Sequence, residues 1–164
     1  KVGGRCGVVI KNTFLGNLDT ASVALRKQLL DECNLFAILE LPAKTFISSP
    51  VKTVVLFFEK GKSTEEIWYY QLSKEKLGRN LGKTNPLKLS ELNEFTEFID
   101  SKVCSEYSWV TNISELDKSN FDLSIKNPNL KEVEDNRTPQ EIIQEIETID
   151  EETDNLLKSI KELI

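Results

Sequence analysis

The sequence contains no histidine and no methionine, and it has only three cysteines. Without histidine, the most common general base of enzymes and the most common metal ligand of proteins are both missing. Cys6, Cys33 and Cys104 are odd in number and widely spaced, which favours buried free thiols over a disulfide framework or a zinc site. We therefore expect no metal site.

Long hydrophobic runs are also missing. No stretch approaches the ~18 consecutive apolar residues that a membrane helix needs, and the N-terminus lacks the pattern of a signal peptide. The sequence therefore predicts a soluble, cytoplasmic protein without membrane contact. Because the chain begins at Lys1 and enters an apolar run within a few residues, we expect it to be a piece of a longer protein.

Motifs of self-contained hydrolases and nucleotide-binding enzymes are absent as well. The sequence has no G-x-S-x-G elbow, no P-loop and no metal-ligand spacing. Neighbouring carboxylates such as Glu65 and Glu66 are better interpreted as parts of a solvated face. A hydrolase is therefore poorly supported.

What the sequence does have is an ordinary globular composition with an uneven charge. Its 164 residues, 39% of them hydrophobic, suffice for one core plus an appendage. Residues 1–90 carry 14 Lys+Arg against 8 Asp+Glu, whereas residues 91–164 carry 7 against 19. The basic part is the plausible site for a polyanion such as DNA, although an evenly solvated surface also explains a modest excess.

Patterns in the first half predict an α/β sheet. Residues 5–10 form a continuous apolar run, typical of a strand buried on both faces. A helix begins at about Asp19, which can cap it, and residues 34–41 form the next strand. Strand, helix and strand in this order predict a crossover unit. Residues 51–60 and 66–72 are two further strands, and their short connection predicts that they are antiparallel neighbours.

The second half is less regular. Residues 78–86 resemble a loop, and Ser90 can cap a helix whose Leu92, Phe95 and Ile99 share one face. Residues 106–129 have no clear periodicity, so we expect irregular structure there, followed by a charged linker.

The C-terminal segment has a clear helical pattern. Thr138 and Glu141 form a capping box around Pro139 at the first helical position. Apolar residues then alternate four and three positions apart, interrupted only by Thr153, at Ile142, Ile146, Ile149, Leu156, Ile160 and Leu163. Such a stripe predicts packing in a helical bundle, either on the helix's own domain or on a partner chain, and the charged linker favours the partner.

Several stretches in a fixed order resemble the modification (M) subunit of type I restriction-modification systems. They are "GRCGVVIKNTFLG", "LRKQLLDECNLFAILELPAKTF", "VKTVVLFFEKG", "EIWYYQL", "FDLSIKNPN" and "RTPQEIIQEIETIDEE". The resemblance implies the C-terminal half of a Rossmann-like S-adenosylmethionine methyltransferase sheet with an antiparallel hairpin, followed by a helical tail. It divides the chain into half of a catalytic domain (1–77), a loop and helix extension (78–137) and a subunit-contact helix (138–164).

The same resemblance implies adenine-N6 methylation of DNA with S-adenosylmethionine by the complete subunit. The family's Gly-rich cofactor motif and its Asn-Pro-Pro-aromatic catalytic motif are absent here, because Asn85-Pro86 and Asn127-Pro128 are not followed by a second proline. We therefore expect no catalytic and no cofactor-binding residue in this segment, and no activity of the segment in isolation.

Phe46 matches the aromatic residue that, in the wider group of adenine methyltransferases, stacks on the flipped-out target adenine. Methylation of a base requires the base to leave the duplex, and an aromatic face replaces the lost stacking. Burial of Phe46 in the core is the alternative. Lys44 and Lys52 flank this position and are weak candidates for contacts with the DNA backbone.

Other polar residues are weaker candidates still. Asn12 and Thr13 follow the first strand, at the edge where α/β sheets bind ligands, but turn formation explains Asn12 equally well. Ser48 and Ser49 stand where some members of the group have basic residues or proline, which puts a phosphate contact in doubt.

The implied partners are DNA and the specificity and restriction subunits of the type I complex, with the helix 138–164 contacting the specificity subunit. The alternative is a non-catalytic assembly module that self-associates through this helix.

Overall fold

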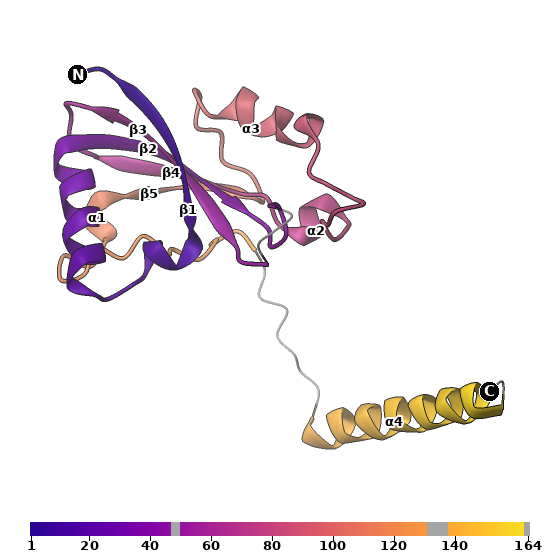
Figure 1. The fold of residues 1–164 in the computed structure, drawn as a ribbon. Coiled ribbons are helices and arrows are strands. Elements are labelled where there is room, and N and C mark those ends of the chain that lie inside the picture. The colour runs from indigo at the N-terminus through magenta and orange to yellow at the C-terminus, as the bar shows by residue number, and fades with distance from the viewer. Residues whose placement is uncertain (47–49, 131–137, 163–164) are drawn as a thin grey trace. The chain divides into compact units, whose positions relative to one another are not determined.

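The structure, a computed structural model, describes residues 1–46, 50–130 and 138–162. The chain separates into two compact units, Lys1–Leu130 and Lys131–Ile164 (Figure 1). The elements, in chain order, are β1 (Arg5–Lys11), a 3-10 turn (Asn12–Leu15), α1 (Thr20–Glu32), β2 (Cys33–Leu41), β3 (Thr53–Lys60), β4 (Glu66–Gln71), α2 (Lys74–Leu77), a 3-10 turn (Leu89–Leu92), α3 (Asn93–Phe98), β5 (Ser108–Asn112), a 3-10 turn (Ile113–Glu115) and α4 (Pro139–Glu162).

The first unit is built on a mixed five-stranded sheet with the order β1-β3-β2-β4-β5. Strands β1 and β2 are both antiparallel to β3 and are therefore parallel to each other, joined through α1. Strand β4 is parallel to β2, and β5 is antiparallel to β4. The predicted α/β class and the strand–helix–strand unit are confirmed.

The prediction that residues 51–60 and 66–72 are neighbours is wrong, because β2 lies between β3 and β4. The connection from β3 to β4 instead crosses the start of β2 and forms hydrogen bonds with it. The buried Thr64 hydroxyl donates to the carbonyl of Cys33 at 2.8 Å and accepts from the amide of Leu35 at 2.9 Å. These hydrogen bonds hold the connection against β2, so a short connection can join β3 to β4 although β2 lies between them.

Each face of the sheet carries its own apolar core, because side chains alternate along the strands. One core, on the face covered by α1, includes Ile67, Tyr69 and Trp109. The other core includes Trp68 and Tyr70 and is covered by Phe95 of α3. The rings of Tyr69 and Trp109 stack with centroids 5.1 Å apart and an interplanar angle of 6°.

Two local predictions in the second half need correction. Residues 106–129 were expected to be irregular, but they contain β5, whose Trp109 and Thr111 are buried and whose Val110 is exposed. Ser90 lies inside a 3-10 turn rather than at a helix cap, and the Glu91 carboxylate accepts from the Lys88 amide at 2.7 Å instead.

The expectation of buried cysteines holds only for Cys33. Cys6 on β1 and Cys104 before β5 are both exposed, and all three are free thiols. Cys6 is exposed because little packs over this part of β1, whose residues 5–9 are all exposed.

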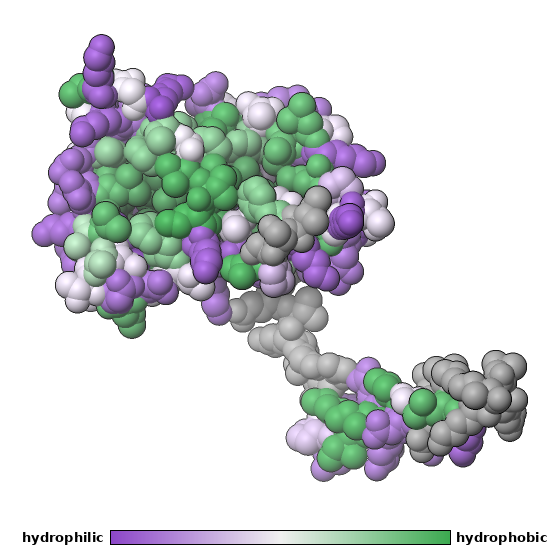
Figure 2. Space-filling model, in the orientation of Figure 1, coloured by the Kyte–Doolittle hydropathy of each residue, from purple (hydrophilic) through white to green (hydrophobic). Residues whose placement is uncertain are grey.

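Strand β1 differs most from the sequence-based expectation, since it was predicted to be buried on both faces. Within the described part of the chain it pairs only with β3, and residues 5–9 are exposed. An apolar groove of about 350 Å³ that includes Val8, Ile10 and Phe58 lies on one face, and a second groove of about 310 Å³ that includes Gly7 and Phe57 lies on the other. Figure 2 shows the hydrophobic residues that gather over this part of the sheet.

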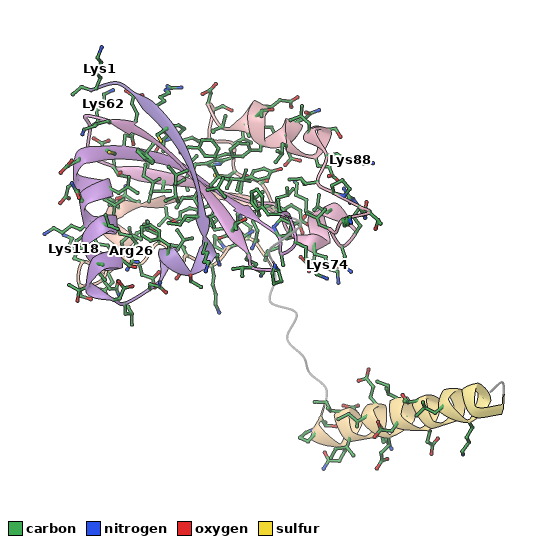
Figure 3. The ribbon with its side chains drawn as sticks, viewed as in Figure 1. Lys1, Arg26, Lys62, Lys74, Lys88 and Lys118 are labelled. Carbon is green, nitrogen blue, oxygen red and sulfur yellow. The ribbon has the colours of Figure 1, made fainter. Side chains whose placement is uncertain are left out.

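Arg26 of α1 is fully buried and ties two distant segments together (Figure 3). Its guanidinium donates to the carbonyls of Phe14 (2.6 Å), Asn17 (2.7 Å), Asn120 (2.8 Å) and Phe121 (2.9 Å). All four acceptors are main-chain oxygens. The planar guanidinium therefore fixes the backbone of residues 14–17, which precede α1, relative to that of residues 120–121.

The second unit contains α4, whose predicted capping box is present. The Thr138 amide donates to Glu141 Oε2 at 2.6 Å, and the Glu141 amide donates to Thr138 Oγ1 at 3.3 Å. Among the residues that the structure describes, no helix is both long enough and apolar enough to cross a membrane.

Candidate functional site

The carboxyl ends of three strands lie at one edge of the sheet, the kind of edge at which α/β proteins bind ligands. Because β1, β2 and β4 are parallel, their carboxyl ends lie at the same edge, together with the start of β3. The amide of Asn12, which follows β1, donates to the carbonyl of Lys52 at 3.1 Å. In sheets of this class, ligands bind outside the carboxyl ends of the strands.

The turn after β2 brings Phe46 to this edge. Thr45 closes the turn, because both its hydroxyl and its amide donate to the carbonyl of Pro42, at 2.7 and 3.4 Å. Lys44 adopts a left-handed backbone conformation with φ of 65°, which reverses the chain direction. The Phe46 side chain is 42% exposed. The alternative that Phe46 is buried in the core is therefore excluded.

Both lysines that were proposed for DNA-backbone contacts are exposed on this edge. Lys44 lies in the turn after β2, and Lys52 directly precedes β3. Ser48 and Ser49 fall outside the described residues. The structure thus brings Lys44, Phe46 and Lys52 onto the two ends of one loop, as expected, while their contacts with DNA remain predictions.

A cavity of about 320 Å³ lies beside this loop, between the ends of β2 and β4. Its apolar walls include Leu41, Pro42 and Leu72. Its charged and polar lining comes from four elements or their flanks and consists of Glu40, Lys52, Gln71, Ser73, Lys74, Glu75, Arg79 and Asn80. The cavity volume lies at the lower end of the range for small-molecule sites.

Glu40 and Gln71 form a hydrogen-bonded pair across two parallel strands. They are register partners, and Gln71 Nε2 donates to Glu40 Oε2 at 3.3 Å. Asn127 Nδ2 contacts Gln71 Oε1 at 3.3 Å and the carbonyl of Glu106 at 2.9 Å. Burial raises the pKa of the Glu40 carboxyl, while the Gln71 amide and the charge of Lys52 oppose this shift.

Sequence reasoning missed this pair. The signal was available, since Glu40 and Gln71 are the polar residues near the carboxyl ends of two mainly apolar strands. What the sequence did not reveal is that β2 and β4 are adjacent, because the neighbour of β4 was predicted to be β3.

Arg79 lines the same cavity but is already occupied. Its guanidinium donates to the Glu91 carboxylate at 2.7 Å and to the carbonyls of Asn85 and Pro86 at 3.2 and 3.1 Å. It therefore holds the loop after α2 in place, and it is a poor candidate for a ligand contact.

The proposed partner helix presents an apolar surface. Ile142, Ile146 and Ile149 of α4 are 38%, 53% and 54% exposed, and Ile143 and Leu157 are exposed as well. The side chains of Leu156, Ile160 and Leu163 lie outside the described residues. Isoleucines at this spacing form an apolar stripe suited to packing against another helix, and the packing partner of α4 stays a prediction.

Comparison with known proteins decides the family. The model of the family described as N-6 DNA Methylase matches residues 1–137. The chain belongs to this family. The resemblance to type I modification subunits is confirmed by a relative from Escherichia coli, the type I restriction enzyme EcoEI methylase subunit. The two are 30% identical over 171 residues, which cover 98% of this chain and 34% of the relative.

Solved structures of N-6 DNA methylase relatives agree with this assignment. One, from a study of complex assembly and conformational transition of the type I R-M system, has a TM-score of 0.73 and 28% identity over 99% of this chain and 36% of its own. The EcoKI M protein has a TM-score of 0.52 and 32% identity over 58% of this chain and 21% of its own. The chain thus spans about a third of the length of the first relatives it matches.

Proposed function

We propose that this chain is a segment of a type I DNA modification subunit that methylates adenine N6 with S-adenosylmethionine. In this proposal the segment supplies the loop that holds the flipped target base and the helix that contacts the specificity subunit. The observation that carries the proposal is the exposed Phe46 on the loop at the carboxyl edge of the sheet. An exposed aromatic face at this edge suits an unstacked base.

DNA binding by the chain tests the role of Phe46. We compare a fully paired duplex with a duplex whose central adenine faces an abasic site, because an unpaired base costs less to extrude. Stacking worth ~1–3 kcal/mol per base predicts that Phe46→Ala weakens the preference for the second duplex by roughly 5- to 150-fold. Fluorescence anisotropy at one fixed salt concentration measures the preference.

Two further variants make the result specific. Phe46→Trp retains an aromatic face and should keep the preference, whereas Val51→Ala removes an exposed apolar side chain from the same loop and should have little effect. An unchanged preference in Phe46→Ala would remove the base-stacking role from this residue.

In this proposal, S-adenosylmethionine is bound by the longer protein and not by the residues of this chain alone. The residues present do not suit the cofactor, because β1 is followed by the 3-10 turn Asn12–Leu15 rather than by a Gly-rich loop leading into a helix. Among the described residues, glycines with positive φ occur at Gly3, Gly61 and Gly78, where they serve turns and a helix end. We therefore expect this chain alone to transfer no methyl group from labelled cofactor to duplex DNA.

Residues 1–77 are proposed to form the C-terminal half of the catalytic domain, with the sheet continuing beyond β1. The open edge of β1 and the apolar grooves on both of its faces support this. Chemical labelling of the Cys6 thiol on β1 tests whether the sheet continues beyond this strand. We expect a maleimide reagent to label exposed Cys6 in this chain but not in the longer protein, with buried Cys33 unlabelled in both. Equal labelling of Cys6 would refute the continued sheet.

The alternative function, an assembly module, rests on the exposed isoleucines of α4. It predicts that the chain self-associates and that Ile146→Asp abolishes a dimer seen by analytical ultracentrifugation, whereas Glu147→Gln does not. The methyltransferase proposal predicts instead that removal of residues 138–164 abolishes capture of the specificity subunit. A monomeric chain whose capture survives this deletion would leave α4 without either role.

A further inference from the structure

We infer that the cavity between the ends of β2 and β4 is a nucleobase subsite in which Glu40 and Gln71 recognise an amine-bearing base, adenine or cytosine. The inference rests on the proposed function, since DNA is the polymer that would supply the base. It adds a second point of contact, because Phe46 does not line this cavity.

The Glu40–Gln71 pair offers both a hydrogen-bond acceptor and a hydrogen-bond donor. A carboxylate only accepts hydrogen bonds when ionised, whereas a carboxamide both donates and accepts. The 3.3 Å bond between Gln71 Nε2 and Glu40 Oε2 places an acceptor group beside a donor group in the cavity lining. Adenine and cytosine each present an exocyclic amine beside a ring-nitrogen acceptor, the complementary pattern.

Asn127 holds the Glu40–Gln71 pair in one orientation. Asn127 Nδ2 lies 3.3 Å from Gln71 Oε1 and also donates to the main-chain carbonyl of Glu106 at 2.9 Å. This contact assigns the carboxamide oxygen of Gln71 to Asn127 and its nitrogen to Glu40. A donor and an acceptor whose positions are fixed before binding discriminate between bases better than freely rotating side chains.

The remaining lining of the cavity combines apolar walls with lysine side chains. Leu41, Pro42, Leu72 and Leu81 provide apolar walls that suit the faces of a planar base. Lys52 and Lys74 are exposed on the same lining, where an ammonium group can attract the phosphate of a nucleotide; Figure 3 labels Lys74 beside α2. The exposed carboxylate of Glu75 in the same lining repels phosphate. The two lysines alone therefore do not favour a polyanion, and the base must bind as well.

Nucleoside monophosphates test the inference on the complete chain. We titrate dAMP, dCMP and dTMP separately into the 15N-labelled protein and follow the side-chain amide signals of Gln71 and Asn127. We expect dAMP and dCMP to shift the Gln71 signals and to bind roughly tenfold or more tightly than dTMP, which has no exocyclic amine. Glu40→Leu should abolish this difference, because the acceptor is lost.

Two controls separate recognition from charge and from folding. Glu75→Gln neutralises a carboxylate of the same lining and should preserve the preference for dAMP and dCMP over dTMP. Glu40→Gln retains an acceptor oxygen and should preserve part of the preference, which shows that the protein remains folded. Retention of the full preference in Glu40→Leu would overturn the assignment of Glu40.

The outcome is separable from the test of Phe46. Equal shifts with all three nucleotides, or none at the Gln71 amide, would overturn the subsite while leaving Phe46-dependent DNA binding untouched. Conversely, loss of the Phe46 effect with dAMP still bound at Gln71 would refute the base-flipping role and retain the subsite.

Discussion

Replacement of the buried Arg26 by methionine tests how the first unit is held together. Methionine fills a similar volume but donates no hydrogen bond, so four main-chain carbonyls lose their charged donor. Hydrogen bonds to charged groups contribute about 1.5–3 kcal/mol each, but relief of the buried charge offsets part of the loss. Each carbonyl left without a donor costs about 1–3 kcal/mol, so after the offset we expect Arg26→Met to lower the free energy of unfolding by about 3–5 kcal/mol.

Guanidinium chloride unfolding, followed by the fluorescence of the buried Trp68 and Trp109, measures the change in the free energy of unfolding. Lys27→Met is the matched control, because Lys27 is the exposed neighbour of Arg26 on the same helix and should change stability by less than about 0.5 kcal/mol. A difference between the two variants below about 1 kcal/mol would refute the reasoning. It would mean that water replaces the guanidinium without penalty.

Three further predictions follow from individual contacts. Thr64→Val removes the hydroxyl that spans the start of β2 and should lower the free energy of unfolding by about 2–3 kcal/mol, whereas the exposed Thr84→Val should not, in urea unfolding. Because burial raises the pKa of Glu40, the native state holds this proton more tightly than the unfolded chain. The contribution of Glu40 to stability therefore falls as pH rises from the ordinary carboxyl pKa of 4.5 through the raised pKa, and Glu40→Gln should lose less stability than the wild type over this rise in pH. Thr138→Ala removes one half of the capping box with Glu141 and should lower the far-UV circular dichroism signal of helix; an unchanged signal would contradict the cap's role.

Local patterns in the sequence were sufficient for the elements whose cause is local. Asp19 caps α1 by accepting from the amide of Ser22 at 2.9 Å, and Thr138 with Glu141 caps α4, because both arrangements need only residues three positions apart. The exposed position of Phe46, by contrast, was implied by the family resemblance and not by a local pattern.

The errors arose where long-range pairing decides the outcome. Loop length favoured a hairpin between β3 and β4, but the two hydrogen bonds of Thr64 to β2 are a tertiary arrangement that no local rule detects. The same skipped strand concealed the pairing of Glu40 with Gln71. Strand β5 was missed because its burial comes from the Tyr69 ring on the neighbouring strand rather than from a periodic pattern of its own.

The sequence separation of the Arg26 contacts has a consequence for synthesis on the ribosome. Two of the carbonyls that accept from Arg26 belong to Asn120 and Phe121, which lie 94 and 95 residues later in the chain. At translation rates of about 5–20 residues per second, Asn120 and Phe121 are synthesised roughly 5–20 s after Arg26. During that interval the nascent sheet lacks the segment that closes one face. Native structure in this unit is therefore a late event of translation, and the chain has the greatest need of chaperones just before that segment emerges.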